Sequence, residues 1–159
     1  MLKYYYFTLF IFLLSCNTTE ETKKKQSSMF ELLSSAETGI DFINQLAFDE
    51  SFNVYTYRNY YNGGGVAIGD INNDGLVDIY FTSNLGENKL YLNEGDFKFR
   101  DITSQAGVAG TKGWSTGVTM VDINGDGLLD IYVCNSGDLA GDNKQNELFI
   151  NNGNMTFTD

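Results

Sequence analysis

Two nine-residue segments of the chain place oxygen-bearing side chains at positions 1, 3, 5 and 9. These side chains are Asp70, Asn72, Asp74 and Asp78 in the first segment and Asp122, Asn124, Asp126 and Asp130 in the second, and the carbonyls of Leu76 and Leu128 complete the two sets. Ca²⁺ takes roughly six to eight oxygen ligands, whereas Mg²⁺ demands stricter octahedral geometry and keeps its waters. The pattern therefore predicts two structural calcium sites, with water completing each coordination shell.

The residues around these oxygens also fit tight metal-binding loops. Gly75 and Gly127 stand where each loop must turn sharply, and Ile71 and Ile123 are expected to anchor the loops to the core. Plain polar turns are the alternative, but two copies of the pattern favour calcium. An EF-hand would need flanking helices and a Glu at position 12, where this chain has Phe81 and Val133.

Both segments lie inside an internal repeat. Residues 65–80 align without a gap on residues 117–132, at an offset of 52. Residues 88–101 align on residues 146–159 at an offset of 58, so the second copy carries six extra residues in a predicted surface loop. A period of about 50 residues is typical of propeller blades.

Each repeat contains four short runs with strand character, which in the first copy are residues 65–68, 79–83, 89–92 and 97–101. Residues 93–96 and 151–154 contain glycine and are predicted to be hairpin turns. The predicted fold class is all-β, with about two blades of four antiparallel strands. Because propellers close with roughly four to eight blades, the chain is expected to be an N-terminal fragment of a longer protein.

The beginning of the chain has the features of an export signal. The predicted segments are a signal peptide at 1–15, a polar tether at 16–28, a leading segment at 29–62, a first repeat at 63–109 and a second at 110–159. Leu13-Leu14-Ser15 before Cys16 resembles the lipobox of bacterial lipoproteins, which implies lipidation of Cys16, with an ordinary cleaved signal as the alternative. The apolar pattern of residues 29–46 fits either a short helix or an irregular strand.

Composition excludes several classes of function. A net charge of −11 argues against nucleic acid as a partner, because phosphate binding needs clustered Lys and Arg. The chain has no histidine, which removes the commonest general base.

Cys134 is expected to pack as a small buried apolar residue.

The repeats resemble the FG-GAP and VCBS repeats of integrin-α-like propellers, especially bacterial proteins related to cartilage acidic protein and the ASPIC/UnbV group. The resemblance is carried by residues 57–70, 99–103 and 113–117 together with the two loops. It implies an integrin-α-like propeller. With the two calcium loops and the signal before Cys16, the chain is expected to be an exported bacterial lipoprotein at the outer membrane or cell surface. The literal Phe-Gly and Gly-Ala-Pro motifs are absent, so integrin-like ligand binding is not carried over.

A non-enzymatic recognition or adhesion module is the predicted function, anchored to a membrane by lipid and binding an unidentified protein or glycan. The alternative is the propeller portion of a polysaccharide-processing enzyme, since fold alone does not decide function. Four aromatic side chains could form a stacking platform for sugars or pack against a neighbouring blade: Tyr55, Tyr57, Tyr60 and Tyr61. The glycines at 63–65 lack phosphate-loop spacing and are expected to begin a strand or form a bulge.

Overall fold

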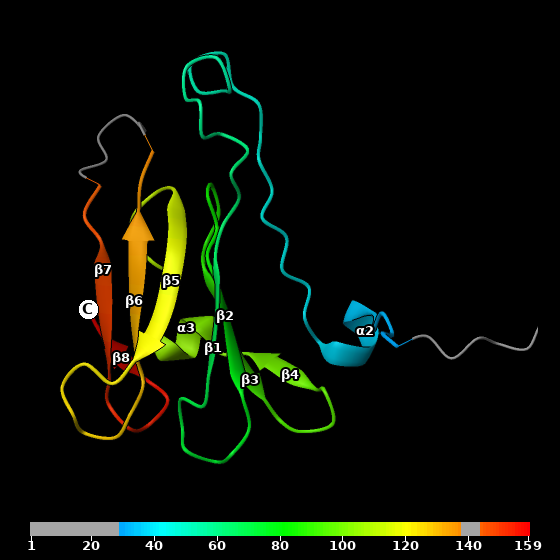
Figure 1. The fold of residues 1–159 in the computed structure, drawn as a ribbon, viewed down its shortest axis with the longest axis vertical. Helices are drawn as coiled ribbons and strands as arrows, with labels where there is room; N and C mark the ends of the chain where they lie inside the picture. Colours follow the sequence, from blue (N-terminus) through cyan, green and yellow to red (C-terminus); the bar gives the residue numbers. More distant parts are fainter. Residues whose placement is uncertain (1–28, 138–143) are drawn as a thin grey trace, which may run out of the picture. The chain divides into compact units, whose positions relative to one another are not determined.

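The computed structural model describes residues 29–137 and 144–159 of the chain (Figure 1). The predicted signal peptide, the tether and Cys16 lie outside the described residues. Residues 33–159 form one unit, and all the strands and helices of the described residues lie in it. In the described part of the chain, no helix has the length and apolar character needed to cross a bilayer.

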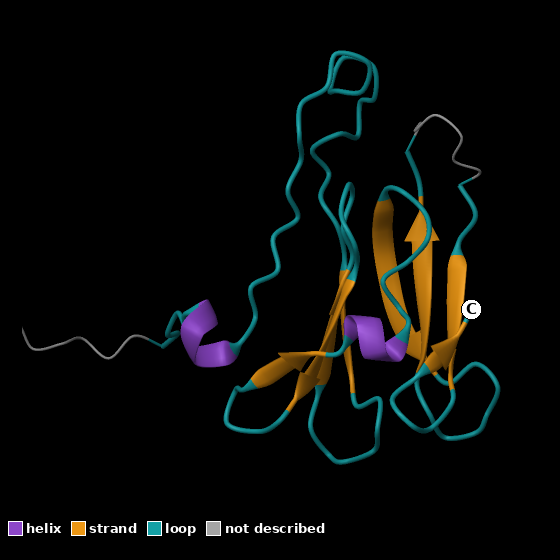
Figure 2. Cartoon of the chain, turned by 180° about the vertical axis from the view of Figure 1, so that it is seen from behind, coloured by secondary structure: helices purple, strands orange, loops and turns teal. Residues whose placement is uncertain are grey.

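The strands form two antiparallel sheets whose strands follow one another in chain order (Figures 1 and 2). The first sheet consists of β1 (Val66–Gly69), β2 (Asp78–Phe81), β3 (Lys89–Asn93) and β4 (Phe99–Asp101). The second consists of β5 (Ser115–Val121), β6 (Asp130–Asn135), β7 (Glu147–Asn151) and β8 (Phe157–Thr158). The predicted four-stranded repeats are confirmed, and in the first repeat the predicted strand ends differ from the observed ones by at most two residues.

Turns that contain glycine reverse the direction of the chain between the third and fourth strands of each sheet. Gly95, between β3 and β4, has φ 90°, and Gly153, between β7 and β8, has φ 76°. A positive φ costs glycine little because it has no Cβ. The two predicted hairpin turns are therefore confirmed.

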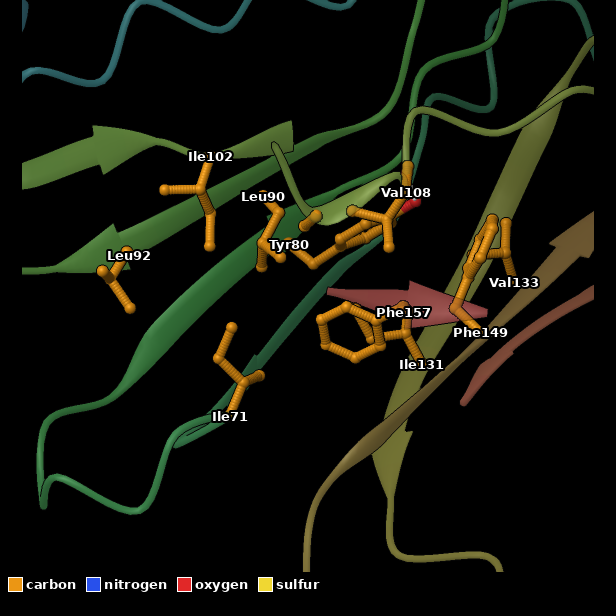
Figure 3. Close-up of a cluster of buried hydrophobic side chains, with 11 residues drawn as sticks. Ile71, Tyr80, Leu90, Leu92, Ile102, Val108, Ile131, Val133, Phe149 and Phe157 are labelled. Atoms are coloured by element: carbon orange, nitrogen blue, oxygen red, sulfur yellow. Dashed lines mark hydrogen bonds between the residues drawn. The ribbon is translucent and has the colours of Figure 1, made fainter. Parts of the chain in front are cut away.

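A hydrophobic core lies between the two sheets (Figure 3). The first sheet, the loop between β1 and β2, and the segment after the sheet, which includes α3 (Thr103–Ala106), supply Ile71, Tyr80, Leu90, Leu92, Ile102, Ala106 and Val108. The second sheet supplies Ile131, Val133, Phe149 and Phe157. Burying one such large apolar side chain is worth about 1.5–3 kcal/mol, so this core is the main force holding the sheets together.

Hydrogen bonds join the sheets at the end of β2 and the start of β5. The Trp114 N–H donates to the Asn84 carbonyl at 2.8 Å, and the Ser115 N–H donates to the Ser83 carbonyl at 3.1 Å. Gly65 permits this close approach, because a Cβ there would stand 2.5 Å from the Thr116 carbonyl oxygen. The predicted role of these glycines at a strand start is confirmed at this position.

The equivalent faces of the two sheets differ in exposure. Val118 and Met120 of β5 are half-buried and pack against the core between the sheets. Their counterparts in the first repeat, Val66 and Ile68, are 57% and 67% exposed. The apolar residues of β1 thus repeat the pattern of β5 without an equivalent sheet covering them among the described residues.

The leading segment forms a short helix followed by chain without regular secondary structure, so of the two earlier alternatives the short helix is confirmed and no strand forms there. Helix α2 (Ser35–Thr38) begins with a capping box between Ser34 and Glu37 and ends at Gly39, whose φ is 80°. The part after α2 lies against the first sheet, where Phe42 stacks on Phe81 with ring centroids 4.9 Å apart. The Tyr91 hydroxyl donates to an Asp41 carboxylate oxygen at 2.8 Å.

Two side chains differ from their predicted environments. Ile71 is buried at 2% exposure, as expected, but Ile123 is 54% exposed, so the predicted anchoring of the second loop by Ile123 is wrong. Ile71 faces the second repeat, whereas no third repeat covers Ile123 within the described residues. Cys134 is half-buried and unpaired rather than fully buried.

Candidate functional site

The two acidic loops occupy the same place in the two sheets. Residues 70–77 connect β1 to β2, and residues 122–129 connect β5 to β6, at the lower end of the view in Figure 1. Gly75 and Gly127 have φ 87° and 86°, which confirms that each loop makes its sharp turn at glycine. The duplicated sequence therefore produces duplicated geometry.

In the first loop, three oxygen-bearing side chains converge. The Asp74 N–H lies 3.2 Å from Oδ1 of Asp70 and 3.2 Å from Oδ1 of Asn72, so these two oxygens are aimed at one point. The Asn72 amide donates to Asp74 Oδ2 at 2.9 Å, and the Leu76 N–H donates to Asp74 Oδ1 at 2.8 Å. Backbone and side-chain donors thus hold the acidic oxygens together inside the loop.

The second loop repeats this arrangement. The Asp126 N–H lies 3.1 Å from Oδ1 of Asp122 and 2.9 Å from Oδ1 of Asn124. The Asn124 amide donates to Asp126 Oδ2 at 2.9 Å. Hydrogen bonds from backbone amides, that of Gly127 foremost, lower the pKa of Asp122 below its ordinary value, so this carboxylate is held in its charged form.

The last acidic position of each loop has a different role in the structure. Asp78 is fully buried, and its carboxylate accepts the N–H of Ile71 at 2.9 Å and the N–H of Asn93 at 2.8 Å. Asp130 is also fully buried and accepts the N–H of Ile123 at 3.0 Å and that of Asn151 at 2.8 Å. Each of these carboxylates therefore ties the start of its loop to the third strand of its sheet.

Burial is the main influence on the acidity of Asp78. It raises the pKa of Asp78 above the ordinary value, because a carboxylate is poorly solvated there. The charges of Asp74 and Asp70 add to this rise in pKa. Hydrogen bonds from the Asn93 and Ile71 amides act in the opposite direction. The loop thus brings together negative charges that repel one another.

The donor set of the loops suits a hard cation. Among the described residues, no three acidic, cysteine or histidine side chains gather closely enough to hold a metal by themselves. In each loop the third convergent donor is an asparagine amide, and all the donors are oxygens, which Ca²⁺ prefers. Asp78 keeps acceptor capacity, because a carboxylate has about four lone-pair sites and two amides use two of them.

A pair of asparagines, missed in the sequence, connects the loops to the sheets. The Asn93 side-chain amide donates to the Val77 carbonyl at 2.9 Å, and Asn151 makes the equivalent bond to Leu129 at 3.1 Å. Asn151 also donates to the carbonyl of Ile71, in the first loop, at 2.8 Å. Both asparagines stand at the same position of the repeat, and this duplication was the signal that could have identified them.

The predicted tyrosine platform is divided between different environments. Tyr60 is buried at 2% exposure and donates its hydroxyl to the Ala47 carbonyl at 2.7 Å, whereas Tyr55 is 92% exposed. Tyr57 and Tyr60 pack around Trp114, with ring centroids 5.3 Å and 5.5 Å from its ring. Tyr61 is 70% exposed and contacts the edge of Tyr60. The centre of this cluster is Trp114, which was not among the predicted site residues.

Comparison with protein families agrees with the loops and the sheets. Residues 70–133, which contain both loops, match the family described as FG-GAP-like repeat. Together with the two four-stranded antiparallel sheets, this match identifies the chain as an FG-GAP repeat protein of the integrin-α-like type, built from repeats like propeller blades.

The chain is also similar in sequence to individual proteins. Cartilage acidic protein 1 of Xenopus tropicalis is 33% identical over 132 residues, which cover 81% of this chain and 19% of the relative. The Homo sapiens protein of the same name is 37% identical over 76 residues, covering 48% of this chain and 12% of the relative. Integrin alpha-8 of Gallus gallus is 32% identical over 124 residues, covering 69% and 12% respectively. The chain therefore spans between 12% and 19% of the length of these relatives.

Proposed function

We propose that this chain is a calcium-stabilised, surface-anchored propeller module that recognises a protein or glycan and does not catalyse a reaction. The observation that carries the proposal is the pair of loops, in which the same oxygens converge in the same way in both repeats. A FG-GAP repeat architecture of the integrin-α-like type supports a recognition role.

The residues that would hold calcium are those of the two loops. Asp70, Asn72, Asp74 and Asp78 would provide side-chain oxygens and Leu76 a carbonyl, with Asp122, Asn124, Asp126, Asp130 and Leu128 in the second loop. Bound calcium would supply positive charge that offsets the repulsion among the loop carboxylates. Asp78 and Asp130 position the loops against β3 and β7, so the loops set the geometry of two strands each.

Recognition and catalysis can be separated by experiment. A panel of glycans and proteins should contain a partner that binds the full-length protein, while incubation with polysaccharides should leave them uncleaved. Cleavage that is lost on substitution of a residue outside the loops would contradict the non-enzymatic proposal.

Removal of calcium is expected to lower the melting temperature of the chain. A ligand that binds only the folded state stabilises it by about 2.7 kcal/mol at a concentration of one hundred times its Kd. Differential scanning calorimetry should therefore show a rise in Tm with Ca²⁺ and a much smaller rise with Mg²⁺. Asp74→Ala and Asp126→Ala should each remove part of this rise, and the double variant should remove nearly all of it.

Asp159→Ala is the matched control for these substitutions, because it removes one exposed carboxylate outside the loops. It should keep the full calcium-dependent rise in Tm. Titration calorimetry should count two sites in the unsubstituted chain. If no calcium binds at millimolar concentration, or if the double variant keeps the whole rise, the loops are polar turns and the proposed function loses its basis.

Anchoring through lipid is the second part of the proposal, and it is supported by the residues before Cys16. Names of relatives that refer to cartilage and to an integrin fit an exported protein. Labelled palmitate supplied to a bacterium that expresses the chain should enter the unsubstituted protein and Cys134→Ser, but not Cys16→Ser. Equal labelling of all three proteins would contradict acylation at Cys16.

A further inference from the structure

An open pocket of about 350 Å³ lies where the leading segment meets the starts of β1 and β5. It is lined by Tyr57 and Trp114, by the glycines at 63–65 and by Gly117. A volume of this size is at the lower end of the range for small-molecule sites in proteins. The pocket draws on both repeats and on the leading segment, so it depends on the whole folded unit.

The walls of this pocket are held in place by close packing. Trp114 is 1% exposed and has φ 62°, an uncommon backbone conformation for a residue with a large side chain. Gly137 lies against its ring, because a Cβ at Gly137 would come within 2.8 Å of the Trp114 side chain. Phe52 packs edge-on to Trp114 at 5.0 Å and stacks on Tyr57 at 5.5 Å. The aromatic wall is therefore preformed rather than assembled around a ligand.

Four of the lining residues are glycines, which present only main chain: Gly63, Gly64, Gly65 and Gly117. A Cβ at Gly64 would stand 2.2 Å from the Thr82 carbonyl oxygen, so no larger residue fits at that position without movement. With no side chains over this stretch, a ligand in the pocket can reach main-chain atoms directly.

The polar groups of the pocket are uncharged. Asn59, Asn62, Thr116 and Ser136 line it, and none of the Asp, Glu, Lys or Arg side chains that the structure describes does. Asn59 and Asn62 are exposed, and their side-chain amides have no hydrogen-bond partner among the described residues. The Tyr57 hydroxyl lies 3.3 Å from the Ser136 hydroxyl, and either one can donate. Amides and hydroxyls together offer both donors and acceptors.

We infer that this pocket binds an uncharged sugar residue. A neutral sugar presents hydroxyls that donate and accept, which matches the amides of Asn59 and Asn62 and the hydroxyls of Tyr57 and Ser136. Its C–H groups can contact the ring of Tyr57, which is half-buried and packs edge-on against the buried Trp114. A charged ligand would lack a compensating side chain among the described residues that line the pocket, and burying a charge without one is costly. This inference rests on the proposed recognition function and names the class of ligand.

Trp114 provides a direct measurement, because it is the single tryptophan of the chain and lines the pocket. The chain, in Ca²⁺, is titrated with the methyl glycosides of glucose, galactose, mannose and N-acetylglucosamine while its intrinsic fluorescence is recorded. At least one of them is expected to change the emission saturably, with a Kd in roughly the millimolar range for so small a ligand. Glucuronate and N-acetylneuraminate, which are charged, should bind more weakly than that glycoside.

Two exposed amides allow the location to be tested without disturbing the fold. Asn59→Ala and Asn62→Ala should each raise the Kd about fivefold, which corresponds to one lost hydrogen bond. Gln105→Ala, which removes an exposed amide of α3 that does not line the pocket, should leave the Kd unchanged. An unchanged Kd in the Asn59→Ala/Asn62→Ala double variant would overturn the assignment of the pocket.

The same samples separate this inference from the proposed function. A full calcium-dependent rise in Tm with no saturable response to any of the four glycosides would overturn the sugar inference and leave the proposed module intact. A lower Kd for the charged sugars than for the neutral glycosides, or binding of a peptide in place of a sugar, would also overturn it. Loss of the calcium effect alone would refute the proposed function while leaving the pocket measurement valid.

Discussion

Phe149→Ala is expected to lower the free energy of unfolding by about 3–5 kcal/mol, the cost typical of truncating a buried phenylalanine. Phe149 is 2% exposed and lies in the core between the two sheets, beside Val133 (Figure 3). Domains of this size have total stabilities of about 5–15 kcal/mol, so the variant should lose a large part of its stability. Urea denaturation followed by circular dichroism measures this loss.

Phe48→Ala is the matched control for this substitution. Phe48 is 74% exposed and lies outside the core cluster, so its truncation should change the free energy of unfolding by no more than about 0.5 kcal/mol. Equal losses in the two variants would mean that the sheets do not pack on each other as the structure has them.

Asp78→Ala is expected to cost about 2–4 kcal/mol even when calcium has been removed by a chelator. The substitution leaves the N–H groups of Ile71 and Asn93 without their acceptor, and each buried unsatisfied amide costs about 1–3 kcal/mol. Asp130→Ala should behave similarly, since Asp130 accepts two amides in the second repeat. Thermal unfolding in chelator gives the comparison.

Asp74→Ala is the natural control within the same loop, because Asp74 is exposed and bonds to the loop itself. In chelator it should cost less than about 1 kcal/mol. Without metal, the loss of stability is therefore expected to be larger for Asp78→Ala than for Asp74→Ala, although both residues belong to the same predicted set of ligands. If Asp78→Ala is as stable as Asp74→Ala in chelator, the buried carboxylate does not tie the loop to β3.

The strands and the loops could be predicted because their signals are local. A repeated run of apolar residues next to a repeated loop fixes where strands begin and end, and glycine marks the turns. The position of Gly75 in a sharp turn followed from its place between Asp74 and Leu76 alone. Duplication then strengthened each local signal by showing it twice.

Features that depend on contacts between repeats could not be predicted in this way. Ile71 and Ile123 occupy the same repeat position, yet one is buried and the other is half exposed, because only the first has a neighbouring sheet among the described residues. Asp70 and Asp78 look equivalent as oxygen donors in the sequence. In the structure Asp78 is fully buried, whereas Asp70 is only half-buried. The Asp78 carboxylate accepts the N–H of Asn93, which lies fifteen residues further along the chain.

The pocket was also invisible in the sequence. Trp114 follows Tyr57 by more than fifty residues, and the two meet because the leading segment folds back over the start of β5. Trp114 belongs to the segment that carries the family resemblance, but nothing in that segment shows what its ring contacts. Proximity across such a separation is set by tertiary packing rather than by local pattern.

The hydrogen bond from Asn151 to the Ile71 carbonyl couples the stability of the first loop to that of the second sheet. Opening the first loop breaks a bond to the second sheet, so the free energy of that local opening contains a nearest-neighbour term as well as an intrinsic one. Amide hydrogen exchange around Ile71 should therefore slow or quicken together with exchange in β7. A series of such repeats behaves as a one-dimensional cooperative array, in which a hydrogen bond from the following repeat stabilises each loop.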